Sequence, residues 1–141
     1  AAHSFRDGGV TVLRDESVDI EGILTLVGRD DRAASRMGSP RLPLADIPGV
    51  DSGLPVIVMD HTPSDLHEAE ETGVALQVSG HTHRGQLWPF NYVTSRIFEQ
   101  DWGFLKKGDT LYYISCGIGV WGPPIRTSSR PEVVVLNLNF Q

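Results

Sequence analysis

The sequence predicts a mixed α/β domain. Two five-residue runs, at 55–59 and 74–78, lack the polar alternation of a half-exposed strand and are typical of strands covered on both faces. Between them, residues 62–72 carry a helix-start signal and acidic side chains in the first turns, and Gly73 provides a stop. A strand–helix–strand unit with a crossover of this length predicts that the two strands lie parallel in one sheet.

The region before this unit predicts a hairpin and a long loop. Residues 1–9 indicate the end of a helix or a loop that closes on two glycines. β-branched residues predict strands at 10–13 and 23–27, and residues 18–20 can pair with the second of these across a tight turn. The following segment is rich in proline and glycine, and it predicts a loop with a short helix near 42–47.

The central helix and the region after it complete the predicted elements. Ser64 or Thr62 is the expected N-cap of the central helix, because short hydroxyl side chains accept hydrogen bonds from its first amides. Residues 91–99 predict a short amphipathic helix, and apolar runs at 111–115 and 133–138 predict two late strands. With no repeat or linker, residues 1–141 are expected to belong to a single domain.

Composition excludes several classes of protein. The formal charge is −6, from 12 basic and 18 acidic residues without a basic cluster, so a nucleic-acid-binding patch is not expected. The single Cys116 permits neither an internal disulfide nor a cysteine zinc cluster, and it is expected to pack in the core. No run is long enough to span a bilayer, and no signal peptide is visible. The chain starts at Ala1 rather than methionine, which suggests a fragment or a processed chain.

Three histidines are the candidate metal ligands. His81 and His83 directly follow the predicted strand at 74–78, and His61 follows the strand at 55–59. Because the carboxyl ends of parallel strands meet at one edge of a sheet, the three imidazoles are expected to converge there. Neutral imidazole is the commonest protein nitrogen ligand, and such a group can hold one ion, or two ions about 3.5–4 Å apart. His67 and His3 are expected on the surface.

These histidines lie in segments that resemble a known family. Gly80-His81-Thr82-His83 and Asp60-His61-Thr62-Pro63 look like the last two metal-binding motifs of the calcineurin-like metallophosphoesterases. The tail at 117–126, the following Arg130-Pro131-Glu132 and the segment at 28–31 are similar to the bacterial YkuE-like branch of that family. The resemblance extends over nearly the whole chain.

The resemblance implies a fold and a metal centre. It implies the C-terminal half of a four-layer α/β/β/α sandwich. In the complete enzyme two divalent ions (Mn, Fe, Zn or Mg/Ca type) would be bound, one by His61 and His81 and the other by His83. A hydroxide bridging these ions would attack a phosphomonoester or phosphodiester. Both ions would hold phosphate oxygens and neutralise the developing charge.

Other motifs of the family do not occur in the sequence. The family also uses an Asp-x-His, a Gly-Asp-x-x-Asp and a Gly-Asn-His-Asp/Glu, which supply the bridging carboxylate and the acid/base histidine. No catalytic residue can therefore be assigned within this chain. Two adjacent dications repel one another unless anionic ligands lie between them. The chain alone is therefore expected to hold at most one ion and to have little or no activity.

Candidate substrate contacts are two arginines and an aromatic segment. Arg126 could pair with a substrate phosphate, and Arg84 could narrow or charge the mouth of the site. Residues 88–90 could line a substrate wall, or simply pack. The substrate could be a phosphomonoester, a phosphodiester or a nucleotide-linked lipid pyrophosphate. Two alternatives to the phosphoesterase are a noncatalytic binding module and a mononuclear three-histidine zinc hydrolase.

The resemblance to half of a sandwich also bears on partners. Half of such a fold would expose apolar sheet faces and edges. We therefore expect the chain to associate with the missing N-terminal half or with a copy of itself. Membrane contact is expected only through an N-terminal segment that this sequence lacks.

Overall fold

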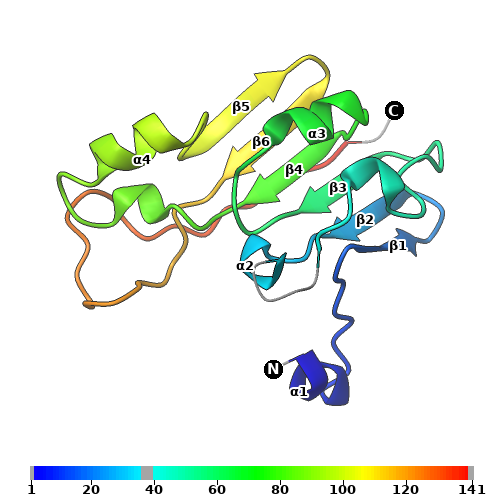
Figure 1. The fold of residues 1–141 in the computed structure, drawn as a ribbon, viewed down its shortest axis with the longest axis horizontal. Coiled ribbons are helices and arrows are strands. Elements are labelled where there is room, and N and C mark those ends of the chain that lie inside the picture. Colours follow the sequence, from blue (N-terminus) through cyan, green and yellow to red (C-terminus); the bar gives the residue numbers. More distant parts are fainter. Residues whose placement is uncertain (1, 36–39, 140–141) are drawn as a thin grey trace.

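The described residues form one six-stranded mixed sheet. The computed structural model describes residues 2–35 and 40–139. The strands are β1 (Glu16–Ile20), β2 (Leu24–Gly28), β3 (Val56–Met59), β4 (Leu76–Ser79), β5 (Gly103–Lys107) and β6 (Thr110–Ile114). They lie side by side in the order β1-β2-β3-β4-β6-β5 (Figure 1). The predicted mixed α/β class is confirmed.

The centre of the sheet is parallel and both of its edges are hairpins. β2, β3, β4 and β6 run parallel to one another, with Val58 opposite Gln77 in the β3–β4 pair. This confirms the parallel pairing that the strand–helix–strand pattern predicted. β1 and β5 pair antiparallel with β2 and β6, so the predicted hairpin before residue 28 is also confirmed.

Short helices connect the strands. The α-helices are α1 (Ala2–Asp7), α2 (Arg32–Ser35), α3 (Leu66–Glu71) and α4 (Asn91–Ile97), and the 3-10 helices are η1 (Leu44–Asp46) and η2 (His83–Gly85). Gly73 follows the C-cap of α3, Thr72, with φ 70°, so the predicted stop is confirmed. The predicted N-caps of α3 were wrong. Its N-cap is Asp65, in a left-handed conformation with φ 54° and without a side-chain capping bond. In the part of the chain that the structure describes, no helix is both long and apolar enough to cross a membrane.

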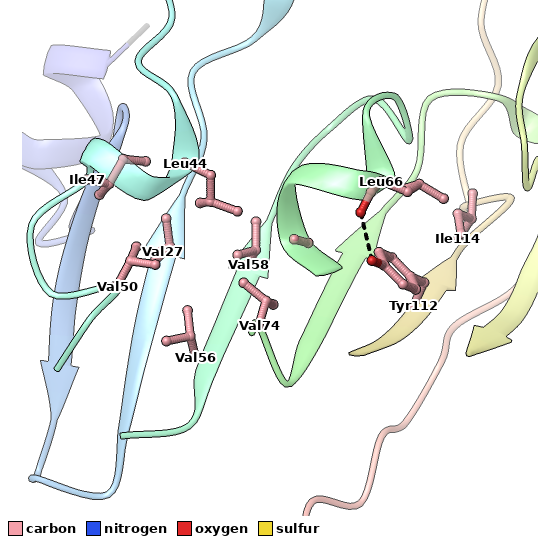
Figure 2. Close-up of a cluster of buried hydrophobic side chains, with 11 residues drawn as sticks. Val27, Leu44, Ile47, Val50, Val56, Val58, Leu66, Val74, Tyr112 and Ile114 are labelled. Carbon is pink, nitrogen blue, oxygen red and sulfur yellow. Dashed lines mark hydrogen bonds between the residues drawn. The ribbon is translucent and has the colours of Figure 1, made fainter. Parts of the chain in front are cut away.

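The core lies on one face of the sheet, under α3 and η1 (Figure 2). Alternate residues of the strands point to it and pack against the two helices; its members include Val27, Val58, Tyr112, Leu44 and Leu66. Burying a side chain such as Leu66 contributes about 1.5–3 kcal/mol. The Tyr112 hydroxyl donates to the Leu66 carbonyl at 2.7 Å, which ties β6 to the start of α3.

The opposite face of the sheet is apolar and less covered. Alternation along the strands places Ile57, Leu76, Leu111 and Phe104 there. No described helix packs over these side chains, and the extended segment 135–139 borders them across a cavity of about 590 Å3. Phe104 is 61% exposed. Ile57 and Leu76 are 8% and 7% exposed, so among these four side chains Phe104, on the edge strand, is the exposed one.

Two predicted strands were wrong and one strand was missed. Residues 10–13 and 133–138 form no ladder, and Val133 is 80% exposed. β-branched residues favour extended backbone but cannot provide the neighbouring strand that makes a ladder. β5 was missed because its sequence, Gly-Phe-Leu-Lys-Lys, has only two apolar residues. Cys116 is buried as predicted.

Candidate metal centre

The structure brings His61 and His81 together where β3 and β4 end. His81 Nδ1 lies 3.0 Å from His61 Nε2, and the two rings meet edge to face with centroids 4.9 Å apart. Backbone hydrogen bonds join the loops that carry them: Asp60 N donates to Val78 O, and Gly80 N donates to His61 O, both at 3.0 Å. The parallel pairing of the two strands therefore continues into the histidine loops.

This pair has the spacing of two ligands on one ion. Imidazole nitrogens bind zinc at about 2.0–2.1 Å, so two ligands at neighbouring coordination positions lie roughly 3–3.4 Å apart. The nitrogens of His61 and His81 are 3.0 Å apart. Among the described residues, no set of three or more His, Cys, Asp or Glu side chains is arranged to hold a metal ion. The separation fits a metal, but the hydrogen bond between the two nitrogens would have to open and further ligands would have to join the pair.

His83 lies in the same cavity but contacts a different partner. Its Nδ1 is 3.0 Å from Arg126 Nη2. A guanidinium can only donate, so His83 Nδ1 must accept this hydrogen bond and the proton of the neutral ring must lie on Nε2. Neither ring nitrogen then has a free lone pair. Ligation of a metal by His83 would therefore require this contact to Arg126 to break.

The environments of His81 and His83 favour neutral rings. Burial lowers the pKa of His81 below its ordinary value, and the neighbouring His61 lowers it further. Burial also lowers the pKa of His83, followed by the charge of Arg126. A neutral ring retains the lone pair that a metal needs, so both histidines can act as ligands at neutral pH once a nitrogen is free.

Arg126 holds the tail loop by its backbone. Its Nη2 donates to the carbonyls of Cys116 at 2.7 Å and Gly117 at 3.2 Å and makes a further contact to Gly119, while Nη1 donates to Ser129 Oγ at 2.9 Å. The guanidinium is thus occupied by the protein. Contact with a substrate phosphate, as the sequence suggested, would need some of these bonds to open.

Arg84 lies against an aromatic ring. Its guanidinium carbon is 4.0 Å from the centroid of the Trp102 ring, which is a cation–π contact. Both side chains line a second cavity, together with Arg126 and Glu132. This cavity is distinct from the one lined by the three histidines, so Arg84 does not line the histidine cavity in this structure.

The histidine loop has an unusual backbone. Four of its non-glycine residues have positive φ: His81 at 67°, His83 at 48°, Arg84 at 49° and Gln86 at 46°. Such conformations cost of order 1–3 kcal/mol each and persist where surrounding structure imposes them, often at active sites. Part of that support comes from Thr82, whose hydroxyl donates to the Asp101 carbonyl at 2.6 Å.

Gln86 joins the histidine loop to the tail, a role that the sequence analysis missed. The side chain is 1% exposed; its Nε2 donates to Trp121 O at 2.8 Å and its Oε1 accepts from Trp121 N at 2.9 Å. Its carbonyl accepts from the amides of Thr127 and Ser128. The signal was weak, because a glutamine after glycine is ordinary for an exposed turn.

Glu132 is the second residue whose role was missed. Its carboxylate accepts from Cys116 N at 2.9 Å, Ser115 Oγ at 3.2 Å and Trp102 Nε1 at 3.2 Å. Burial, the largest single influence, raises the pKa of Glu132, but these hydrogen bonds together bring it below its ordinary value. The charged form therefore holds the tail against the end of β6.

Replacing Glu132 with glutamine is expected to destabilise the fold at neutral pH and much less in acid. A carboxyl whose folded pKa is depressed stabilises the fold above its unfolded pKa of about 4.3, and this contribution is lost as pH falls through the folded pKa. Urea unfolding at pH 7 and below pH 4 measures both conditions. Glu71→Gln, at an exposed position of α3, is the control. An equal deficit at both pH values would contradict this role.

Comparison with known proteins identifies the family. The chain is 38% identical over 138 residues to an uncharacterised metallophosphoesterase of Aquifex aeolicus, covering 95% of this chain and 52% of that protein. It is 33% identical over 132 residues to an uncharacterised metallophosphoesterase of Helicobacter pylori, covering 92% of this chain and 35% of that protein. The chain belongs to the metallophosphoesterases. The resemblance found in the sequence is thereby confirmed.

The match covers only part of each metallophosphoesterase. The chain spans 52% and 35% of the length of these two relatives, a share consistent with one half of such a protein. It is also 25% identical over 142 residues to the UDP-2,3-diacylglucosamine pyrophosphatase LpxG of Chlamydia muridarum, covering 92% of this chain and 42% of that protein. No family model matches the chain. No solved structure matches it either.

Proposed function

We propose that this metallophosphoesterase chain takes part in metal-dependent hydrolysis of a phosphomonoester or phosphodiester. The observation that carries the proposal is the His61–His81 pair, whose ring nitrogens lie 3.0 Å apart beyond two parallel strands. The relatives named metallophosphoesterases support the reaction class. His61, His81 and His83 are the proposed metal ligands.

The metal ions, the histidines and Arg126 have different proposed roles. When bound, divalent ions supply hydroxide at neutral pH and neutralise charge on the phosphate. The facing nitrogens of His61 and His81 are 3.0 Å apart, a separation that two ligands of one ion can have, and β3 and β4 hold both loops in place. Arg126 keeps the tail loop closed and, on leaving His83, can turn its donors to a phosphate oxygen.

The proposed site needs carboxylates from outside the described residues. Asp60 precedes His61 but is buried and paired with Arg41 through both carboxylate oxygens. Without an anionic ligand between them, two adjacent dications would repel one another. We therefore propose that this chain alone holds at most one ion. A complementary half that carries the missing motifs would provide these groups.

The substrate is proposed only as a class. The name of LpxG describes a pyrophosphatase that acts on a nucleotide-linked, diacylated sugar, and this relative is 25% identical to the chain. A nucleotide-linked lipid pyrophosphate therefore joins simple phosphomonoesters and phosphodiesters as a candidate substrate.

Metal loading followed by turnover tests this function. The 141-residue chain and the natural gene product that carries it would be stripped of metal, titrated with Mn²⁺, and assayed with p-nitrophenyl phosphate and bis(p-nitrophenyl) phosphate. We expect at most one ion per chain and no turnover for the chain alone, and metal-dependent turnover for the gene product.

Each other outcome contradicts a defined part of the proposal. Ordinary enzyme turnover by the isolated chain would contradict its incompleteness, and with a single bound ion it would favour the mononuclear zinc alternative. No metal and no turnover in either sample would favour a noncatalytic binding module.

A further inference from the structure

The histidine cavity is polar at one end and apolar along its wall. It has a volume of about 440 Å3, within the range of small-molecule sites. The three histidines line one part of it, and Phe90, Val93, Phe98 and Trp121 line another. A ligand that fills such a cavity must itself combine a metal-binding or anionic group with an apolar portion.

The apolar wall continues onto the surface as an apolar rim, which we define as the exposed apolar side chains of segments 88–97 and 118–125. In this rim Trp88 is 67% exposed and Trp121 62%. α4, which lies within the first segment, buries none of its residues against the described part of the chain. Between Gly85 and Phe98 the single charged residue is Arg96, and between Gly117 and Ile125 there is none.

The rim is built on an ordered frame. The buried side chain of Gln86 bonds the backbone of Trp121 from both its amide nitrogen and its oxygen. Trp88 N also donates to Thr127 Oγ1 at 2.8 Å. These bonds hold the two segments together beside the histidines. Exposed apolar surface that borders a cavity is typical of ligand-binding grooves and of surfaces that a partner covers.

We propose that the cavity takes an amphiphilic phosphate ester, with its phosphate at the histidines and its acyl or alkyl chain along the apolar rim. The placement of the phosphate rests on the proposed phosphoesterase function. The placement of the acyl or alkyl chain rests on the apolar rim alone. A lipid chain suits this surface because tryptophan and tyrosine tolerate a boundary between hydrocarbon and water, and because the rim offers almost no charge to a polar partner.

Selectivity for a long chain tests the proposal. Dodecyl phosphate, below its micelle concentration, and ethyl phosphate would each be titrated into the natural gene product with Mn²⁺. Each buried methylene strengthens binding by about fourfold, so dodecyl phosphate should bind at least about tenfold more tightly than ethyl phosphate. A bromine at the far end of the dodecyl chain should quench the fluorescence of Trp88 and Trp121.

A matched pair of variants locates the effect. Phe90, in the cavity wall, is 55% exposed. Phe5 is 58% exposed and belongs to α1, a helix that lies far from α4 (Figure 1). Phe90→Ser should reduce the ratio of the two affinities severalfold, and Phe5→Ser should not change it. Any effect of either substitution on binding of the phosphate group changes both affinities equally, so it cancels in their ratio.

The outcomes separate this inference from the proposed function. Turnover of small chromogenic esters together with equal affinities for the two phosphates would overturn the inference alone. Long-chain selectivity without turnover of any ester would overturn the proposed function and leave the lipid-binding surface. A third outcome combines two results: bromine does not quench tryptophan fluorescence, and Phe90→Ser lowers the stability of the protein but not its selectivity for dodecyl phosphate. This outcome would show that a polypeptide covers the rim, and it would also overturn the inference.

Discussion

Replacing His81 with asparagine is expected to lower the affinity of the chain for Zn²⁺ by at least about a hundredfold. Loss of a residue that only supports a ligand typically costs about 10–100-fold in metal affinity, and His81 is itself half of the one close imidazole pair in the described chain. Asparagine tolerates the left-handed backbone at this position, where φ is 67°, but its amide is a much poorer zinc ligand.

Competition with a fluorescent zinc chelator measures this affinity directly. His67→Asn, at an exposed position on α3, changes the same residue type outside the site and should leave the affinity unchanged. Far-UV circular dichroism checks that both variants fold. Zinc binding by His81→Asn at the wild-type affinity would exclude the His61–His81 pair as the metal centre.

Replacing Gly85 with alanine is expected to destabilise the fold by roughly 2–5 kcal/mol and to displace the histidine loop. A Cβ at this position would lie 2.2 Å from Asn91 N and 2.5 Å from Phe90 C, which are backbone atoms at the start of α4. The φ of Gly85 is 72°, a conformation that costs an L-residue about 1–2 kcal/mol, and overpacking commonly costs about 1–3 kcal/mol more.

Urea denaturation gives the free energy of unfolding, and the zinc titration reports on the histidines in the same variant. Gly80→Ala is the matched control on the other side of the motif, because its Cβ would meet only Ser115 O, at an ordinary 3.8 Å. If Gly85→Ala were as stable as Gly80→Ala, the close approach of α4 to the histidine loop would be wrong.

The convergence of His61 and His81 could be predicted from the sequence. Each histidine follows an uninterrupted apolar run, and the helix between the runs requires a crossover connection. Crossover connections between neighbouring strands make parallel pairs, so both histidines had to appear at one edge of the sheet. The family motifs supported the same conclusion, and the comparisons confirmed the family.

The surroundings of the site could not be predicted in this way. Gln86 and Glu132 act through partners 30 or more residues away: Gln86 bonds Trp121, and Glu132 bonds Trp102. Arg126 was expected to face a phosphate, but the structure turns it to His83 and to nearby carbonyls. Such contacts depend on how loops pack. The local sequence pattern does not predict which distant residue will be the hydrogen-bond partner.

The sequence by itself determined the α/β class, the parallel strand pair and the ends of the strands at which the histidines lie, because hydrophobic periodicity and crossover geometry are local properties. Tertiary structure alone decided that 133–138 finds no strand to pair with, that His83 is held by Arg126, and that an apolar rim stays exposed beside the cavity. These depend on which surfaces remain after the core on one face of the sheet has been filled.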